Sequence, residues 1–141
     1  VRYMPVAPGY TDQAAYEAVL GFFPRIVLAS LIAFLVGSFV NSFILAKLKV
    51  KTKGKKMWFR LISSTFVGEL LDTIVFAIVA FGGILTGSDM VIFILVGWLF
   101  KTGVEIILLP VTYKAITFIK KIEGQDFYDK KTDFNPFRLK L

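Results

Sequence analysis

Two acidic residues, Glu69 and Asp72, lie inside the apolar segment 61–83, which is long enough to cross a lipid bilayer. A charged side chain near the bilayer centre costs about 2.5–3.5 kcal/mol on insertion scales, so an acid at this depth points to a functional site. In a helix, Glu69 and Asp72 are three residues apart and Thr65 precedes Glu69 by four, so all three side chains share one face. Such carboxylates accept hydrogen bonds, pair with a cation or exchange a proton.

A second pair of charges lies in the apolar segment 90–118, where Lys101 and Glu105 are four residues apart and therefore neighbours on one helix face. Together with Glu69 and Asp72, they place three carboxylates and one ammonium at membrane depth. One lysine neutralises only one carboxylate, so the remaining acids are expected to take up a proton or to reach water. These charges predict an aqueous cavity or ligand site, with a purely structural ion pair as the alternative.

The apolar segment 22–46 contributes a polar face of its own. Gly37 follows Ser30 by seven residues and Asn41 follows Gly37 by four, so the three lie on one side of a helix. Small residues let membrane helices approach closely, which is the simplest interpretation of Ser30 and Gly37. Asn41 fits that role less well and is a candidate ligand contact. Aromatic side chains at a similar level either stack on a planar ligand or pack against helices and lipid: Phe66, Phe76, Trp98 and Phe100.

These residues need helices that cross a membrane to position them. The chain has 141 residues, of which 56% are hydrophobic and 19% charged, whereas soluble domains average roughly 45–50% apolar and 25% charged residues. The apolar residues concentrate in three runs, which predict membrane spans at 22–46, 61–83 and 90–118. The sequence therefore predicts an all-α, polytopic helical membrane protein with a transmembrane bundle over 22–118.

The distribution of basic residues predicts the orientation of these spans. The segment 47–60 carries seven Lys and Arg side chains and no acid, and a short loop of this kind is cytoplasmic by the positive-inside rule. Six more basic residues follow the third span, so residues 119–141 are expected to form a cytoplasmic tail. Residues 1–21 then form an extracytoplasmic lead-in with an interfacial helix. We expect the N-terminus of this chain outside and its C-terminus inside.

Composition argues against several kinds of chemistry. The chain has no histidine and no cysteine, which removes His-based catalysis, disulfides, thiolate metal sites and the common zinc ligands. An intramembrane aspartyl protease needs two aspartates in its site, but only Asp72 lies in a predicted span. The net charge of +7 concentrates in the loop and tail that orient the protein, so nucleic-acid binding is not expected. We expect no enzyme activity, no cofactor and no metal.

Several ordered features resemble the queuosine precursor transporter family, also called the vitamin uptake transporter family. They cover nearly the whole chain and include a distinctive C-terminal motif. They are Arg25 with Ala29–Ser30, Arg60 with Ser63–Thr65, the run from Glu69 through Asp72–Thr73 to Ala80–Gly82, Glu105 with Pro110 and Tyr113, and the tail from Lys121 through Phe127–Asp129 to Asp133–Phe137.

This resemblance implies a six-helix protein of the cytoplasmic membrane that imports deazaguanine precursors of the modified tRNA base queuosine, such as 7-cyano-7-deazaguanine. It also implies both termini in the cytoplasm, whereas this chain is expected to have three spans and an outside N-terminus. The chain is therefore interpreted as the C-terminal half of the six-helix protein. The missing N-terminal helices of the same protein would then be its partner.

The substrate that the resemblance implies has polar groups that these residues together would bind. A guanine-like ring presents two adjacent N–H donors that one carboxylate accepts in a bidentate way, so Asp72 or Glu69 would grip this edge. Asn41 or Thr73 would contact the ring carbonyl or other groups. The candidate substrate-binding set comprises Asp72, Glu69, Asn41, Thr73, Ser30, Lys101 and Glu105.

Two alternatives to this function stay open on the sequence. One is a non-transporting membrane scaffold or partner-binding subunit, whose charges only hold helices together. The other is a transporter of another vitamin-like solute. A homo-oligomer is compatible with either.

Overall fold

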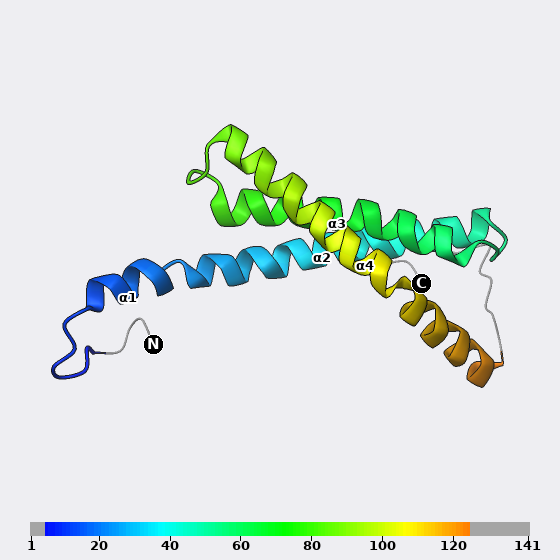
Figure 1. Ribbon diagram of the computed structural model, residues 1–141, viewed down its shortest axis with the longest axis horizontal. Helices are drawn as coiled ribbons and strands as arrows, with labels where there is room; N and C mark the ends of the chain where they lie inside the picture. Colours follow the sequence, from blue (N-terminus) through cyan, green and yellow to red (C-terminus); the bar gives the residue numbers. More distant parts are fainter. Residues whose placement is uncertain (1–4, 125–141) are drawn as a thin grey trace, which may run out of the picture.

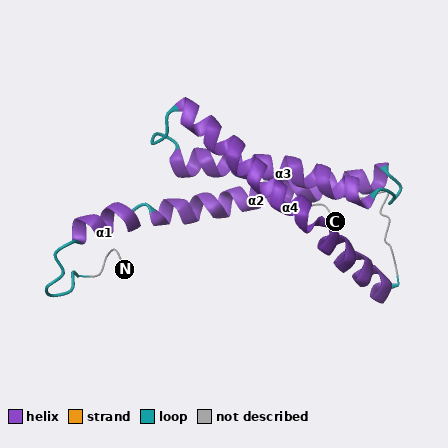
Figure 2. Ribbon diagram, viewed as in Figure 1, coloured by secondary structure: helices purple, strands orange, loops and turns teal. Residues whose placement is uncertain are grey.

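The chain folds into four helices, shown in a computed structural model that describes residues 5–124. Helix α1 spans Gln13–Leu20, α2 spans Phe23–Lys51, α3 spans Met57–Phe81 and α4 spans Gly87–Glu123. Within residues 5–124 every regular element is a helix, as Figure 2 shows. Three segments are long and apolar enough to cross a membrane: α1 and α2 together, α3, and α4. The predicted all-α class and the three spanning helices are therefore confirmed.

The helices run further than the apolar runs that predicted them. Helix α2 continues past residue 46 to Lys51, and α3 begins at Met57, so only residues 52–56 of the basic segment form a non-helical turn. Lysines in the last turn of a helix interact favourably with the negative end of its dipole, which supports the extension of α2. Gly54 in the turn has a φ of 72°, a conformation that glycine adopts without strain. Of the predicted tail 119–141, the structure describes residues 119–124, where α4 ends.

Helices α2 and α3 form a closely packed antiparallel pair, side by side in Figure 1. The buried residues of α2 are Ala29, Ala33 and Gly37, spaced by four along one face. A Cβ atom on Gly37 would lie 2.7 Å from the Asp72 Cβ, and one on Gly68 would lie 2.8 Å from the Asn41 Cβ. Real Cβ atoms do not approach so closely, so these two glycines permit the contact. Gly37 packs as the sequence predicted, whereas Ser30 lies one position off this face and is exposed.

Helix α4 crosses α3 at an angle, as the yellow-green to orange ribbon in Figure 1 shows. Its contact with α3 is smaller than that of α2, and Thr102 is the one buried residue among those of α4. The helix carries many exposed large apolar side chains, as expected for a surface that meets lipid or further helices. Examples are Val96, Leu99, Ile107 and Val111. Within residues 5–124, α2 and α4 do not pack extensively against each other, and a groove lined by α2, α3 and α4 lies between them.

Candidate functional site

The groove between α2 and α4 contains an open cleft of about 580 Å³. Ligand pockets for small molecules measure roughly 300–1,000 Å³, so this cleft is large enough for a single planar heterocycle. All three spanning helices line it: Ser30, Phe34, Gly37, Ser38 and Asn41 from α2, Thr65, Gly68, Glu69 and Asp72 from α3, and Phe100, Lys101, Val104 and Glu105 from α4. Six of the seven residues predicted from the sequence therefore meet in one cleft.

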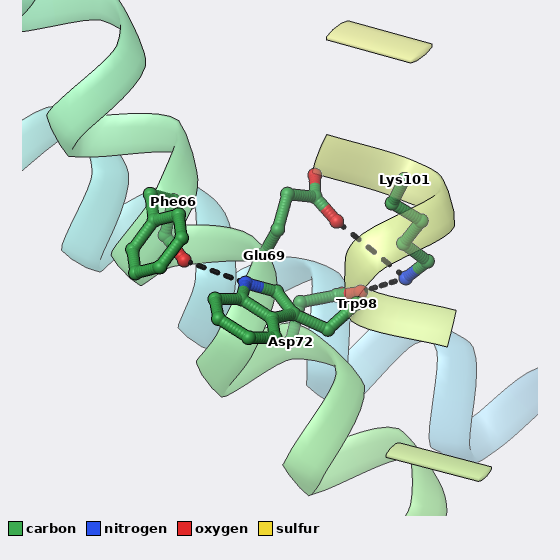
Figure 3. Close-up of polar contacts among 5 residues, drawn as sticks. All are labelled: Phe66, Glu69, Asp72, Trp98 and Lys101. Atoms are coloured by element: carbon green, nitrogen blue, oxygen red, sulfur yellow. Dashed lines mark hydrogen bonds and ion pairs between the residues drawn. The ribbon is translucent and has the colours of Figure 1, made fainter. Parts of the chain in front are cut away.

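A lysine and two carboxylates form the centre of this cleft. Lys101 reaches from α4 and donates a hydrogen bond to Asp72 Oδ2 on α3, as Figure 3 shows. The Lys101 Nζ also lies 3.6 Å from Glu69 Oε2, one helix turn away on α3. The side chains of Lys101, Glu69 and Asp72 are 43%, 27% and 19% exposed. The charges are therefore accessible from the cleft rather than sealed inside the protein.

The sequence left open which acid Lys101 joins, because Glu105 lies on the same face of its own helix. The structure turns Lys101 toward α3 instead. Glu105 Oε2 accepts a hydrogen bond of 2.8 Å from the Thr65 hydroxyl, which links the same two helices one turn further along. The Asn41 Oδ1 on α2 is buried and has no hydrogen-bond partner among residues 5–124. This end of the cleft therefore presents acceptor oxygens and is suited to a ligand that brings N–H donors.

Thr73 is the one predicted site residue that does not line the cleft. It is 2% exposed and lines a smaller cavity of about 230 Å³ on the other side of Asp72. Its hydroxyl oxygen has no hydrogen-bond partner in the described part of the chain. Other residues around this cavity are Ala33, Phe76, Phe93 and Gly97. Thr73 follows Asp72 directly and so points about 100° away from it around the helix, which turns Thr73 away from the cleft, whereas Asp72 lines both cavities.

The four aromatic residues that the sequence offered as stacking partners also differ in whether they line the cleft. Trp98 donates an indole N–H bond of 3.0 Å to the Phe66 carbonyl and lies edge-on to the Phe66 ring, with centroids 4.5 Å apart, as Figure 3 shows. Phe76 stacks with Phe93 beside the smaller cavity, at a centroid distance of 6.3 Å. Phe100 is 73% exposed and lines the cleft. Only Phe100 of the four predicted aromatics is therefore available to a ligand in the cleft.

Seven lining residues of the cleft were not in the predicted substrate-binding set: Phe34, Gly37, Ser38, Thr65, Gly68, Phe100 and Val104. Phe34 and Ser38 are four and eight residues after Ser30, so they occupy the same face of α2. The spacing of Ser30, Ser38 and Asn41 places them on one side of a helix, so the sequence pattern could have identified Ser38 as a lining residue. Phe34 carried no such signal, because an apolar side chain in an apolar span does not stand out. Among the described residues, no group of three or more acidic side chains is placed to hold a metal ion.

The spanning helices and the charged cleft between them define the class of this protein. It is an integral membrane protein with a polar site between its helices. A family model described as "Putative vitamin uptake transporter" matches residues 1–115. The chain therefore belongs to this vitamin uptake transporter family, and the resemblance noted from its motifs is confirmed. The tail motif beyond Lys121 lies outside the matched range, and residues 125–141 lie outside the described part of the structure.

A curated relative carries a more specific name. The chain is 32% identical over 113 residues to a "Probable queuosine precursor transporter" from Bacillus subtilis (strain 168), a match that covers 79% of this chain and 49% of the relative. The chain thus spans about half the length of that protein. No solved structure matches the fold.

Proposed function

We propose that this chain is part of a transporter that imports queuosine precursors, deazaguanine bases such as 7-cyano-7-deazaguanine, across the cytoplasmic membrane. The observation that carries the proposal is the cleft with its accessible carboxylates, Glu69 and Asp72, at membrane depth on α3. The name of the Bacillus subtilis relative supports the choice of substrate.

Asp72 is the residue that holds the substrate in this proposal. The pyrimidinone edge of a guanine-like ring has two neighbouring N–H donors, which match the two oxygens of one carboxylate. Asn41 offers an amide to the remaining polar groups of the ring, and Phe34 and Phe100 offer ring faces for stacking. A solute without the paired donors leaves the carboxylate unpaired and is rejected.

The cleft needs a covering that residues 5–124 do not supply. Half-exposed charges cannot face hydrocarbon at low cost, because a charge at the bilayer centre costs about 2.5–3.5 kcal/mol even on insertion scales. We therefore propose that further membrane-spanning helices of the same protein close the cleft over Lys101 and Glu69. The relative, of which this chain covers 49%, is long enough to contain them. A second copy of this chain is the other arrangement that would close the cleft.

The orientation belongs to the proposal as well. The turn 52–56 and the end of α4 carry clustered lysines, which supports a cytoplasmic position for both and an outer position for α1. The cleft then extends from its outer end, at Ser30 and Asp72, toward the cytoplasm, at Asn41 and Glu105.

The substitution Asp72→Asn tests the function. It keeps the size of the side chain but removes the charge that pairs with the ring donors, so we expect uptake of labelled 7-cyano-7-deazaguanine to fall at least about tenfold. Uptake is measured in cells that depend on an imported precursor, with the amount of protein in the membrane quantified. Asp89→Asn is the matched control, because Asp89 lies outside the cleft and accepts a bond from Thr86. Normal uptake by Asp72→Asn at normal expression would refute the site.

A scaffold or partner-binding subunit is the competing function, and one observation favours it. The polar contacts of Lys101 and Glu105 join α4 to α3, as contacts with a purely structural role also would. In a scaffold, the double substitution Lys101→Met with Glu105→Gln lowers at most the stability of the protein and preserves any activity of the folded protein. Loss of uptake with unchanged expression would argue against the scaffold, and thermal stabilisation by a panel of solutes would separate deazaguanines from other vitamin-like substrates.

A further inference from the structure

The central carboxylate of the cleft already has a partner. Lys101 donates a hydrogen bond to Asp72 Oδ2, so the lysine and a bidentate substrate compete for this oxygen and for the charge of Asp72. We propose that Lys101 exchanges between two acceptors, and that Glu69 holds it while substrate occupies Asp72. This inference rests on the proposed function and assigns Glu69 the role of a positioning residue that acts through the lysine.

The geometry makes Glu69 the natural second acceptor. Its Oε2 lies 3.6 Å from the Lys101 Nζ, and apart from Asp72 no other carboxylate among residues 5–124 lies within 4 Å of that atom. The lysine ammonium has three donors on a flexible four-carbon stem, so a rotamer change suffices to move it between acids one helix turn apart. Without Glu69, displacement would leave a charge unpaired at membrane depth, which carries a free-energy cost. Glu69 offsets most of that cost.

The two cavities give this exchange a consequence for the path of the substrate. Asp72 and Lys101 line both the cleft and the smaller cavity, so their ion pair lies at the boundary between the two. Glu69 lines only the cleft. Movement of the ammonium toward Glu69 therefore withdraws it from the boundary and opens the smaller cavity, with the unpartnered Thr73 hydroxyl, to the cleft. The ion pair acts as a gate that the correct substrate opens by taking Asp72.

A double-mutant cycle tests the role of Glu69. We expect Glu69→Gln to raise the Kd for 7-cyano-7-deazaguanine about tenfold or more in the full-length protein, because Lys101 loses its second acceptor. In the Lys101→Met background there is no charge to hold, so Glu69→Gln should change the Kd less than about twofold. The same loss in both backgrounds would mean that Glu69 contacts the substrate directly and would overturn the exchange.

A second measurement needs no substrate and so separates the gate from the proposed function. These 141 residues contain no cysteine, so a thiol introduced by Thr73→Cys is the one site within them that a polar thiol reagent labels. Adding Asp72→Asn leaves Glu69 as the charged acceptor for Lys101 and should raise the labelling rate several-fold. Adding Glu69→Gln should not raise it, because Lys101 then stays on Asp72.

The control for this measurement is Ser30→Cys, since Ser30 lines both cavities and its labelling should not depend on the gate. Equal labelling of the Thr73→Cys thiol with and without Asp72→Asn would refute the gate. If the wild-type protein binds no deazaguanine but the labelling pattern holds, the proposed substrate is wrong and the gate stands.

Discussion

The two contacts of helix α3 are built in opposite ways. Against α2, the contact depends on small side chains: Ala29, Ala33 and Gly37 are buried, and the backbones meet at Gly37 and Gly68. Against α4, it depends on larger side chains: Trp98 packs on Phe66, Lys101 is joined to Asp72, and Thr65 is joined to Glu105. One interface is fixed by shape and the other by exchangeable bonds.

This difference assigns separate roles to the helices. Close packing of small residues has no alternative arrangement of similar energy, because any shift brings backbone atoms into collision. Hydrogen bonds between membrane helices contribute only about 0.6–2 kcal/mol each, so they can be exchanged for others at little cost. The pair α2–α3 therefore forms a rigid frame, and α4 forms a wall that can shift when Lys101 changes partner.

The largest effect is expected where the frame is tightest. In Gly37→Ala the new Cβ would lie 2.7 Å from the Asp72 Cβ and 3.1 Å from the Gly68 carbonyl oxygen. Neither atom is the end of a flexible chain, so the helices must separate, and we expect a loss of about 1–3 kcal/mol of stability. Thermal unfolding of the purified protein in detergent measures it.

Gly103→Ala on α4 is the matched control for this prediction. A Cβ there meets nothing within 4 Å, and alanine favours a helix over glycine by about 1 kcal/mol. We expect unchanged or raised stability. If the two alanine substitutions have equal effects, the description of α2–α3 as a shape-fixed frame is wrong.

A smaller effect is expected at the end of the frame. Arg25 on α2 donates bonds of 2.8 Å and 2.6 Å to the carbonyls of Val79 and Gly82, where α3 ends. A cation there also interacts favourably with the helix dipole. Arg25→Gln should lower stability by about 1–2 kcal/mol, measured by thermal unfolding. Lys114→Gln removes an exposed cation of α4 and should have almost no effect; a similar loss in both would show that net charge, not the cap, is responsible.

Much of this architecture could be predicted from the sequence, because hydrophobic length and charge asymmetry are properties of the chain itself. Three apolar runs gave three spanning helices, and helical spacing placed Glu69 and Asp72 on one face. The boundaries of the helices were less accurate, since α2 and α4 continue through lysine-rich residues that hydrophobicity marks as loop or tail.

What the sequence could not supply was the choice among equivalent partners. Lys101 had Glu105 four residues away on its own helix, yet it bonds Asp72, because α4 crosses α3 at that level. Ser30 and Ala29 are adjacent in sequence, and only packing showed that alanine faces α3 while serine faces the cavities. Thr73 lies outside the cleft for the same reason. Such choices depend on the rotation of each helix, which no local pattern reports.

The smallest effect is expected at the movable wall. Thr65→Val keeps the shape of the side chain but removes the hydroxyl that donates to Glu105 at 2.8 Å. We expect a loss of about 1 kcal/mol, because the acid is exposed and water replaces part of the lost bond. Thr112→Val is the control, since the Thr112 hydroxyl bonds only to Leu108 of its own helix. Thermal unfolding measures both variants. If Thr65→Val destabilises the protein as much as Gly37→Ala, α4 is held as rigidly as α2, and the contrast between frame and wall does not exist.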